Sequence, residues 1–340
     1  MTAGTDPSLS QAIAPVAVGD HVVATCWLKG VAAFATVGGS VVLARGDEVQ
    51  RVEAHPGAGI LSAAGDGARL LTGGDDGRVA ETLPDGSTRT LAAAKGGWID
   101  ALALSTGGAF AFATGRRIVS RDGRGTEKFL EVPSTARGLA FAPKGYRLAA
   151  SHYNGATLWF PNVEGRPENL EWKGSHLDVT WSPDARFVVT SMQENSLHGW
   201  RLQPDKGHMR MSGYPAKTRS LSWSHDGKWL ATSGAEAAII WPFESRDGPM
   251  GKAPRECGVR PARVSRVAFH PGALVLAAGY EDGCLLLIRL ADASELLVRA
   301  PVEDRAAKDG AITALSWNDR GRHLAFGCAN GDAGILTLPA

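Results

Sequence analysis

Nine histidines are the residues of this 340-residue chain that could most readily carry chemistry, because imidazole binds metals and moves protons near neutral pH. They stand at His21, His55, His152, His176, His198, His208, His225, His270 and His323. No HExxH pair occurs, and no linear spacing among the histidines favours a metal site. Only a fold that joined loops from distant parts of the chain could assemble one, so we expect no metal and no cofactor.

Other catalytic motifs are also missing from the sequence. There is no GxxxxGKS or GxxxxGKT phosphate loop and no GxSxG nucleophile elbow. The four cysteines fall in no CxxC spacing, which indicates neither a disulfide framework nor a zinc site; they are Cys26, Cys257, Cys284 and Cys328. This cysteine usage fits a reducing compartment, and we expect a cytoplasmic protein.

The composition narrows the classes of partner. Lysine and arginine number 36 and aspartate and glutamate 35, a net charge of +1, whereas a general nucleic-acid binder would be basic. The first 20 residues have neither a basic start nor a long apolar run, so no secretory signal is indicated. Uncharged stretches such as residues 30–44 fall short of the roughly 18–20 residues that span a bilayer. We therefore expect no membrane partner, and nucleic acid is disfavoured.

One sequence phrase recurs along the whole chain: apolar and small residues, a large apolar residue, a tight turn, and a second apolar run. Eight copies begin at Thr25, Leu61, Leu102, Leu139, Val179, Leu221, Val267 and Leu315. Eight copies in 340 residues leave 340/8 = 42.5 residues for each. The first copy divides into four short apolar runs, HVVATCW, VAAFAT, SVVLAR and EVQRVEA. A four-stranded repeat of this length predicts an all-β fold, a single β-propeller of four-stranded blades.

The copies of the repeat predict the number of blades, and the two ends of the chain predict how the ring closes. Eight copies favour eight blades, and seven blades with a divergent N-terminal segment is the alternative. The last copy ends at Leu338 after three strands, and the apolar segment 12–18 could supply the fourth. The ring would then close by pairing the N- and C-terminal strands, which removes exposed sheet edges. Residues 1–20 are thus assigned to closure and residues 21–340 to the propeller.

These repeats resemble the WD-repeat (WD40) family of β-propellers from about residue 20 to residue 338. The turn motif of that family is similar to Trp181-Ser182-Pro183-Asp184 and Trp223-Ser224-His225-Asp226-Gly227. Its second turn resembles Gly74-Asp75-Asp76-Gly77 and Glu281-Asp282-Gly283. No copy ends its third strand in Trp-Asp. The hydrogen-bond set typical of a blade comes nearest to completion in His55, Thr72 and Asp76, where Thr82 replaces the expected tryptophan.

The repeats also predict which side chains face the central channel. The large residue of each first strand is taken as the reference: Trp27, Ala63, Leu104, Phe141, Trp181, Trp223, Phe269 and Trp317. The residue before it is always small: Cys26, Ser62, Ala103, Ala140, Thr180, Ser222, Ala268 and Ser316. Because side chains alternate along a strand, the small residues should face the channel and the references the layer between blades. The residue two positions before each small residue should face the channel as well. At this position Asp178 and Arg266 are charged, and they are the candidates for the channel mouth.

The loops that lead into the first strands form one face of a propeller, and the resemblance implies that this face docks partners. We call them lead-in loops. Their candidate partner-binding residues are His21, Trp98, Arg137, His176, Lys217, Arg219, Arg263 and Lys308. Acidic residues in the neighbouring turns would make a surface of mixed sign, which favours docking in one orientation. Trp98 is the sharpest candidate, because tryptophan and arginine dominate interface hot spots.

These observations predict a non-enzymatic protein–protein interaction platform that presents loop faces of a rigid propeller to one or more partner proteins. The alternative is a propeller enzyme, or a binder of a metal or small molecule, with a site at the channel mouth. That site would use Asp178, Arg266 and nearby histidines. Propellers host both kinds of function, so the site has to decide between them.

Overall fold

The computed structural model describes residues 8–105, 107–302 and 310–339. They form antiparallel sheets, one short 3-10 turn, and no helix in these ranges that is long and apolar enough to cross a membrane. The chain divides into two compact units. The first unit comprises residues 1–36, 44–49 and 219–340, and the second comprises residues 37–43 and 50–218.

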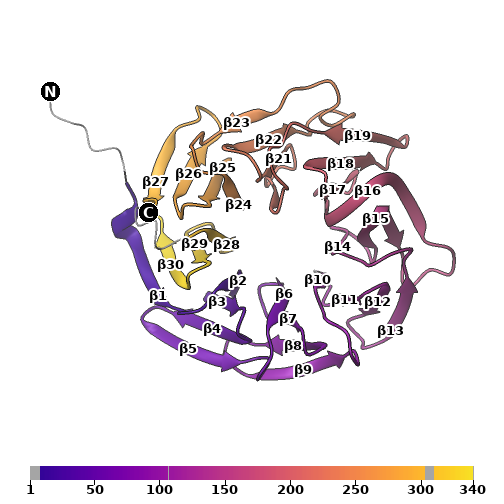
Figure 1. The fold of residues 1–340 in the computed structure, drawn as a ribbon, viewed down its shortest axis with the longest axis horizontal. Coiled ribbons are helices and arrows are strands. Elements are labelled where there is room, and N and C mark those ends of the chain that lie inside the picture. Colours follow the sequence, from indigo (N-terminus) through magenta and orange to yellow (C-terminus); the bar gives the residue numbers. More distant parts are fainter. Residues whose placement is uncertain (1–7, 106, 303–309, 340) are drawn as a thin grey trace. The chain divides into compact units, whose positions relative to one another are not determined.

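Strands within each four-stranded sheet are neighbours in chain order, except where β1 joins the end of the chain (Figure 1). One sheet contains β2 (Val22–Leu28), β3 (Val31–Thr36), β4 (Ser40–Arg45) and β5 (Glu48–Glu53). Another contains β20 (Leu221–Trp223), β21 (Trp229–Thr232), β22 (Ala238–Pro242) and β23 (Arg255–Cys257). The next contains β24 (Val264–Phe269), β25 (Val275–Tyr280), β26 (Leu285–Arg289) and β27 (Glu295–Arg299). The last contains β28 (Ile312–Trp317), β29 (His323–Cys328), β30 (Asp332–Thr337) and β1 (Ile13–Ala17), which follows the turn η1 (Ser10–Ala12).

Three further sheets belong to the second unit. The first contains β6 (Ile60–Gly65), β7 (Leu70–Gly74), β8 (Arg78–Thr82) and β9 (Thr88–Ala93). The second contains β10 (Ala101–Leu104), β11 (Phe110–Thr114), β12 (Arg117–Arg121) and β13 (Glu127–Glu131). The third has six strands: β14 (Gly138–Phe141), β15 (Leu148–Trp159), β16 (Glu168–Trp181), β17 (Phe187–Met192), β18 (Ser196–Arg201) and β19 (Gly207–Met211).

The expectation of eight blades is wrong, because the described strands form seven hydrogen-bonded sheets. The copies that begin at Leu139 and Val179 share the six-stranded sheet, since β16 runs without a break from Glu168 to Trp181. This segment has no proline and a single glycine, so no residue type ends the strand where a connecting loop was expected. The alternative count of seven matches the number of sheets. That alternative assumed a divergent N-terminal segment, but the two copies that share one sheet lie in the middle of the chain.

The N-terminal segment supplies an outer strand to the last sheet. Strand β1 pairs antiparallel with β30, with Ile13 opposite Leu336 and Ala17 opposite Asp332. Ahead of β1, the Leu9 amide donates to the carbonyl oxygen of Leu297 on β27, at 2.7 Å. The segment therefore contacts two sheets of the first unit.

The turns between first and second strands repeat one hydrogen-bond arrangement. The Ser182 hydroxyl donates to Asp184 at 2.6 Å and accepts the Phe187 amide at 2.9 Å. Ser224 does the same with Asp226, at 2.6 Å, and with the Trp229 amide, at 3.0 Å. Serine and aspartate satisfy backbone amides locally in this way, which closes the hairpin and sets where the second strand begins.

The turns between second and third strands depend on glycine. Gly77 has φ +74°, and a Cβ there would lie 2.3 Å from the carbonyl oxygen of Ala94. Gly283 has φ +83°, and its Cβ would lie 2.6 Å from the carbonyl oxygen of Gly310. Both glycines therefore combine a left-handed conformation with close backbone contact, which only a residue without a side chain tolerates. The contacts fix each turn against the loop that leaves its own sheet.

Neighbouring first strands are joined by tryptophan side chains. Trp27 on β2 donates its indole N–H to the carbonyl oxygen of Ser316 on β28, at 3.0 Å. Trp181 donates to Ala140 at 3.0 Å, and Trp317 donates to Ala268 at 3.2 Å. In all three pairs the acceptor is one of the small residues that precede a reference position. Trp27 and Trp317 thus lie between two sheets, as expected, whereas Trp181 and Ala140 both belong to the six-stranded sheet.

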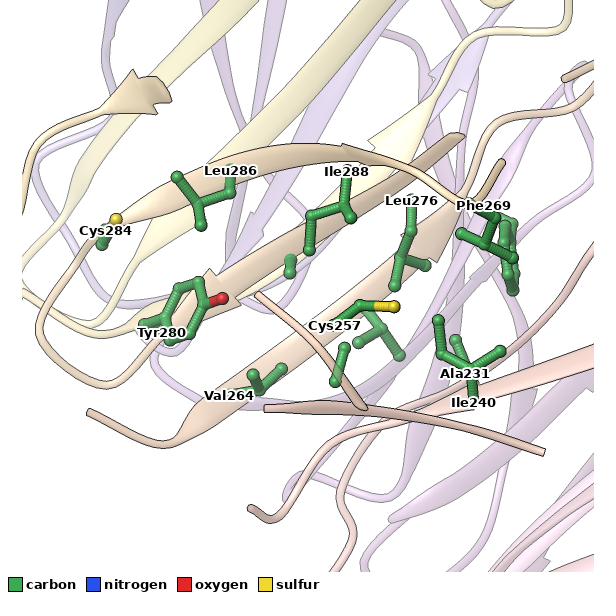
Figure 2. Packing of buried hydrophobic residues seen from close by; sticks show 14 residues of the cluster. Ala231, Ile240, Cys257, Val264, Phe269, Leu276, Tyr280, Cys284, Leu286 and Ile288 are labelled. Carbon is green, nitrogen blue, oxygen red and sulfur yellow. The ribbon is translucent and has the colours of Figure 1, made fainter. Parts of the chain in front are cut away.

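Apolar side chains fill the layer between neighbouring sheets. Figure 2 shows this layer between β20–β23 and β24–β27. Ala231 and Ile240 from one sheet contact the cluster formed by Phe269, Leu276 and Ile288 from the other, and all five are buried. This burial is the main source of stability between sheets, at about 25 cal/mol for each Å² of apolar surface removed from water.

We predict that Trp181→Phe lowers the free energy of unfolding by about 1 kcal/mol more than Trp159→Phe, measured by urea denaturation. Both tryptophans are buried, at 5% and 9% exposure, so both substitutions lose similar ring area. Of these two tryptophans, only Trp181 donates an indole hydrogen bond to another described residue. Equal losses in the two variants would show that the indole hydrogen bond does not stabilise the fold.

Candidate functional site

Trp98 is the most exposed large aromatic side chain of the described residues, at 67%. Its backbone is nevertheless held firmly, because the next residue, Ile99, is fully buried. The Ile99 amide donates to Gly74 O at 3.0 Å, and its carbonyl oxygen accepts from the Ser62 hydroxyl at 2.8 Å. A rigid loop thus presents an exposed indole, which lowers the entropy cost of binding.

The predicted residue Arg137 joins this loop to the next lead-in loop. Its guanidinium lies 3.2 Å from the carboxylate of Asp100, and both side chains are partly exposed. In the same loop, the Ser134 hydroxyl accepts the Tyr153 amide at 2.8 Å. The Tyr153 side chain is 52% exposed. The loops of Trp98 and Arg137 and the strand residue Tyr153 are therefore connected by these contacts.

A cleft of about 770 Å³ opens beside Tyr153, and we call it the aromatic cleft. It lies entirely within the second unit. It is lined by Pro133, Ser134, His152, Tyr153, Asn154, Asn169, Leu170, Glu171, Trp172 and Lys173. Sequence reasoning pointed to the neighbouring loops but not to this cleft.

A bulge in β16 shapes the cleft. Tyr153 pairs with Ser175, but Gly155 pairs with Glu171, so residues 172–174 face Asn154 alone. The side-chain oxygen of Asn154 accepts the Gly174 amide at 3.3 Å. The extra residues push Trp172 and Lys173 out of the regular ladder, as bulges commonly do beside functional sites.

His176 was predicted to contact a partner, and this prediction is wrong because its side chain is only 1% exposed. Its Nε2 lies 2.9 Å from the carbonyl oxygen of Trp172, and its Nδ1 lies 2.7 Å from the Thr190 hydroxyl. Burial lowers the pKa of His176, which favours the neutral ring. A neutral His176 donates from Nε2 to Trp172 and accepts from Thr190, so it holds the bulge from within.

His198 supports the ring of Trp172. The two rings stack with centroids 4.0 Å apart and planes 16° apart. His198 is fully buried, and neither ring nitrogen has a hydrogen-bond partner in the structure. Burial, followed by the nearby His208, lowers the pKa of His198 to about 3. The floor beneath Trp172 is therefore a neutral aromatic contact at physiological pH.

A second, smaller pocket of about 230 Å³ lies on the other side of Trp172. It is lined by Trp172, Lys173, Met192, Glu194, Ser196 and Arg210. The Glu194 carboxylate accepts the Ser175 amide at 3.0 Å, whereas Lys173 and Arg210 form no ion pair within the described residues. Trp172 therefore separates a cleft with one residue of each charge from a pocket with two cations and one carboxylate.

The other predicted partner-binding residues have separate positions. In the first unit Arg263 is exposed and lies 3.9 Å from Glu281, and the His21 amide donates to Asp20 at 2.7 Å. Arg219 is exposed in the first unit, and Lys217 is half-buried in the second. Lys308 lies outside the described residues.

The two candidate channel-mouth residues belong to different units, and each has local contacts. Arg266 donates from Nε to Thr313 O at 2.6 Å and from Nη1 to Ser265 O at 3.0 Å, which ties β24 to β28. Asp178 is exposed, and its Oδ1 accepts the Val179 amide at 2.8 Å. The contacts of Arg266 give it a structural role, and neither side chain adds support for the enzyme alternative.

No group of three or more histidine, cysteine, aspartate or glutamate side chains within the described ranges could hold a metal ion. The expected triad of the second repeat does assemble. His55 Nδ1 lies 3.1 Å from Asp76, and Nε2 lies 2.9 Å from Thr72. The triad stabilises the sheet β6–β9 from inside, and His55 is fully buried.

Sequence reasoning missed Tyr153, Trp172 and Lys173. Tyr153 lies within β15, at the position where other copies carry acidic turn residues. Trp172 stands four residues before His176, inside a segment that was expected to be a loop. An aromatic residue at each of these two positions was the available signal.

Comparisons with known proteins agree with this fold. The family described as "WD domain, G-beta repeat" matches residues 206–241, which include the Trp223–Gly227 turn. Periodic tryptophan protein 2 of Saccharomyces cerevisiae is 22% identical over 242 residues, 61% of this chain and 23% of that protein. Protein HIR1 of Cryptococcus neoformans is 24% identical over 218 residues, 55% of this chain and 24% of that protein. The chain spans about a quarter of the length of these relatives.

Two solved structures share the fold at low identity. The C-terminal WD40 domain of Sif2 matches with a TM-score of 0.75 and 13% identity, over 99% of this chain and 100% of that one. The computationally designed Ika8 protein matches with a TM-score of 0.72 and 14% identity, over 94% and 97%. These two likenesses show the fold. One repeat of the chain matches the WD-repeat family model, and the listed relatives are similar to the chain over a little more than half of its length.

We predict that stability falls as the pH is lowered from about 6.5 toward 4, by an amount on the order of 3 kcal/mol from His198. The pKa of His198 is about 3 in the folded protein, so only the unfolded chain binds a proton at this position in that window. The contribution of His198 to the free energy of unfolding is therefore fully present above the pKa of histidine in the unfolded chain, about 6.5, and is lost as the pH falls toward the folded pKa. Urea denaturation at several pH values measures the slope.

His198→Phe keeps an aromatic ring beneath Trp172 and removes the titration, so we expect a flatter profile. His225→Phe changes an exposed histidine and serves as the matched control. Parallel profiles for His198→Phe and the unmodified protein would refute this assignment.

Proposed function

We propose that this chain is a non-enzymatic protein-interaction platform and that a partner protein docks on the lead-in loops of the second unit. The observation that carries the proposal is a pair of strongly exposed aromatic side chains whose backbones are fixed by hydrogen bonds. Trp98 lies on a lead-in loop, and Tyr153 lies on β15 beside the lead-in loop that contains Ser134. Large exposed aromatic groups on rigid loops are costly in water and favourable in an interface.

The surrounding charges support docking in one orientation. Arg137 and Asp100 form a partly exposed pair beside Trp98, and Lys173 and Glu171 lie in the aromatic cleft. Charges of both signs around an aromatic centre steer a partner and reject those with the wrong pattern. Members of this family generally bind other proteins, which is consistent with the proposal.

The proposal includes a reducing, cytoplasmic location. All four cysteines are free thiols, and Cys257, Cys284 and Cys328 are buried. Burial raises the pKa of Cys328 to about 11, so this thiol stays protonated and unreactive.

We predict that Trp98→Ala and Tyr153→Ala each weaken the partner complex about 30-fold, because hot-spot aromatics contribute about 2 kcal/mol or more. The partner is found by affinity purification of the tagged chain from a lysate of its source organism, with mass spectrometry. The affinity of the purified pair is then measured by titration calorimetry.

Phe129→Ala is the matched control, because Phe129 is also strongly exposed, at 53%, but lies on the outer strand β13. We expect it to bind with unchanged affinity. A partner that is lost with Phe129→Ala and kept with Trp98→Ala and Tyr153→Ala would place docking elsewhere and contradict the proposal.

A further inference from the structure

The polar groups of the aromatic cleft show which chemistry it can accept. His152 is nearly buried, and its Nδ1 lies 2.8 Å from the carbonyl oxygen of Tyr153. A carbonyl accepts but cannot donate, so Nδ1 must carry a proton. Burial lowers the pKa of His152, which favours the neutral ring. A neutral ring has one N–H, so Nε2 must be an acceptor.

This tautomer fixes the next two groups. The Thr157 hydroxyl lies 2.8 Å from His152 Nε2 and must give its single proton to that nitrogen. The same hydroxyl lies 2.8 Å from the amide oxygen position of Asn169. Two acceptors cannot share that contact, so the Asn169 amide is rotated by 180° and Nδ2 donates to Thr157. The carbonyl oxygen of Asn169 then turns to the opposite side, away from Thr157, as an acceptor with no partner among these groups.

A second acceptor lies nearby. Glu171 is exposed, lines the cleft, and forms no ion pair among the described side chains. Tyr153 and Trp172 add two aromatic rings to the lining. The one cation of the lining is Lys173, which also lines the pocket on the far side of Trp172. The negative charge of Glu171 and the positive charge of Lys173 sum to zero. The selectivity of the cleft therefore comes from the positions of its acceptors and ring faces rather than from net charge.

We propose that the aromatic cleft receives an arginine side chain of the docked partner. A guanidinium is planar, has five N–H donors and stacks on aromatic faces, so it matches a carboxylate, an amide oxygen and two rings together. A neutral apolar side chain would leave both acceptors without donors, which is costly in an interface. The inference rests on the proposed docking face and names what that face recognises.

The test uses the full chain labelled with 5-fluorotryptophan, and the ¹⁹F signal of Trp172 is assigned by its loss in Trp172→Phe. The probe is acetyl-arginine N-methylamide. We expect a saturable shift of the Trp172 signal with a dissociation constant in the millimolar range, as for a ligand of this size. The citrulline analogue has the same shape without the charge, and we expect it to bind at least about fivefold more weakly.

Three variants identify the contacts. Glu171→Gln and Asn169→Ala should each weaken the arginine probe about fivefold, and Lys173→Met should strengthen it by removing a like charge. Glu164→Gln removes an exposed carboxylate outside the cleft lining and should change nothing. The inference is overturned if the Trp172 signal does not saturate, if citrulline binds equally well, or if acetyl-aspartate binds and Lys173→Met abolishes its binding.

The probe experiment and the partner experiment fail separately. If arginine does not bind while Trp98→Ala still loses the partner, the docking face stands and the arginine cleft falls. If arginine binds but the partner is indifferent to Trp98 and Tyr153, the cleft stands and the docking proposal falls.

Discussion

The close approach of neighbouring first strands is the constraint on which the candidate site depends, and a hydrogen bond from a first-strand tryptophan to the neighbouring backbone fixes that approach. Its acceptors are the carbonyl oxygens of Ser316, Ala140 and Ala268, and the three residues share one requirement, a small side chain. A larger residue there would keep the neighbouring strand too far away for the indole to reach. Serine extends the same principle, since Ser222 accepts the Phe269 amide at 2.9 Å. Close approach of first strands therefore explains both the small residues and the large ones beside them.

Fixed first strands leave the loops that lead into them little freedom. The backbone of Ile99 and the amide of Tyr153 are hydrogen-bonded to neighbouring segments. The exposed rings of Trp98, next to Ile99, and of Tyr153 are therefore presented in one position. The departure from regular repeats occurs where β16 continues through two copies, and this is where the aromatic cleft forms. Its bulge is held by two neutral histidines, His176 at the backbone and His198 beneath the ring. The candidate site thus uses the one sheet that breaks the repeat pattern.

The sequence was sufficient for the strand pattern and for the positions of Trp27 and Trp317 between sheets. Local chemistry determines both: serine and aspartate close one turn, glycine closes the next, and alternation assigns the faces. The number of sheets was not predictable in this way, because the absence of a turn signal between Glu168 and Trp181 had to be weighed against eight copies of the repeat. His176 was misassigned for a related reason, because it was placed in a lead-in loop, whereas β16 continues through this segment and buries the side chain. Tyr153 and Trp172 come together only through pairing of β15 with β16, which the repeat does not encode.

Hydroxyl-radical footprinting of the chain with and without its purified partner tests the central claim most directly, because aromatic side chains report their own exposure. The account predicts that Trp98 and Tyr153 lose reactivity in the complex, while Phe129 and Phe160, exposed at 53% and 42%, keep theirs. Protection of Phe129 or Phe160 with unchanged reactivity at Trp98 and Tyr153 would contradict it and move the interaction surface away from the lead-in loops.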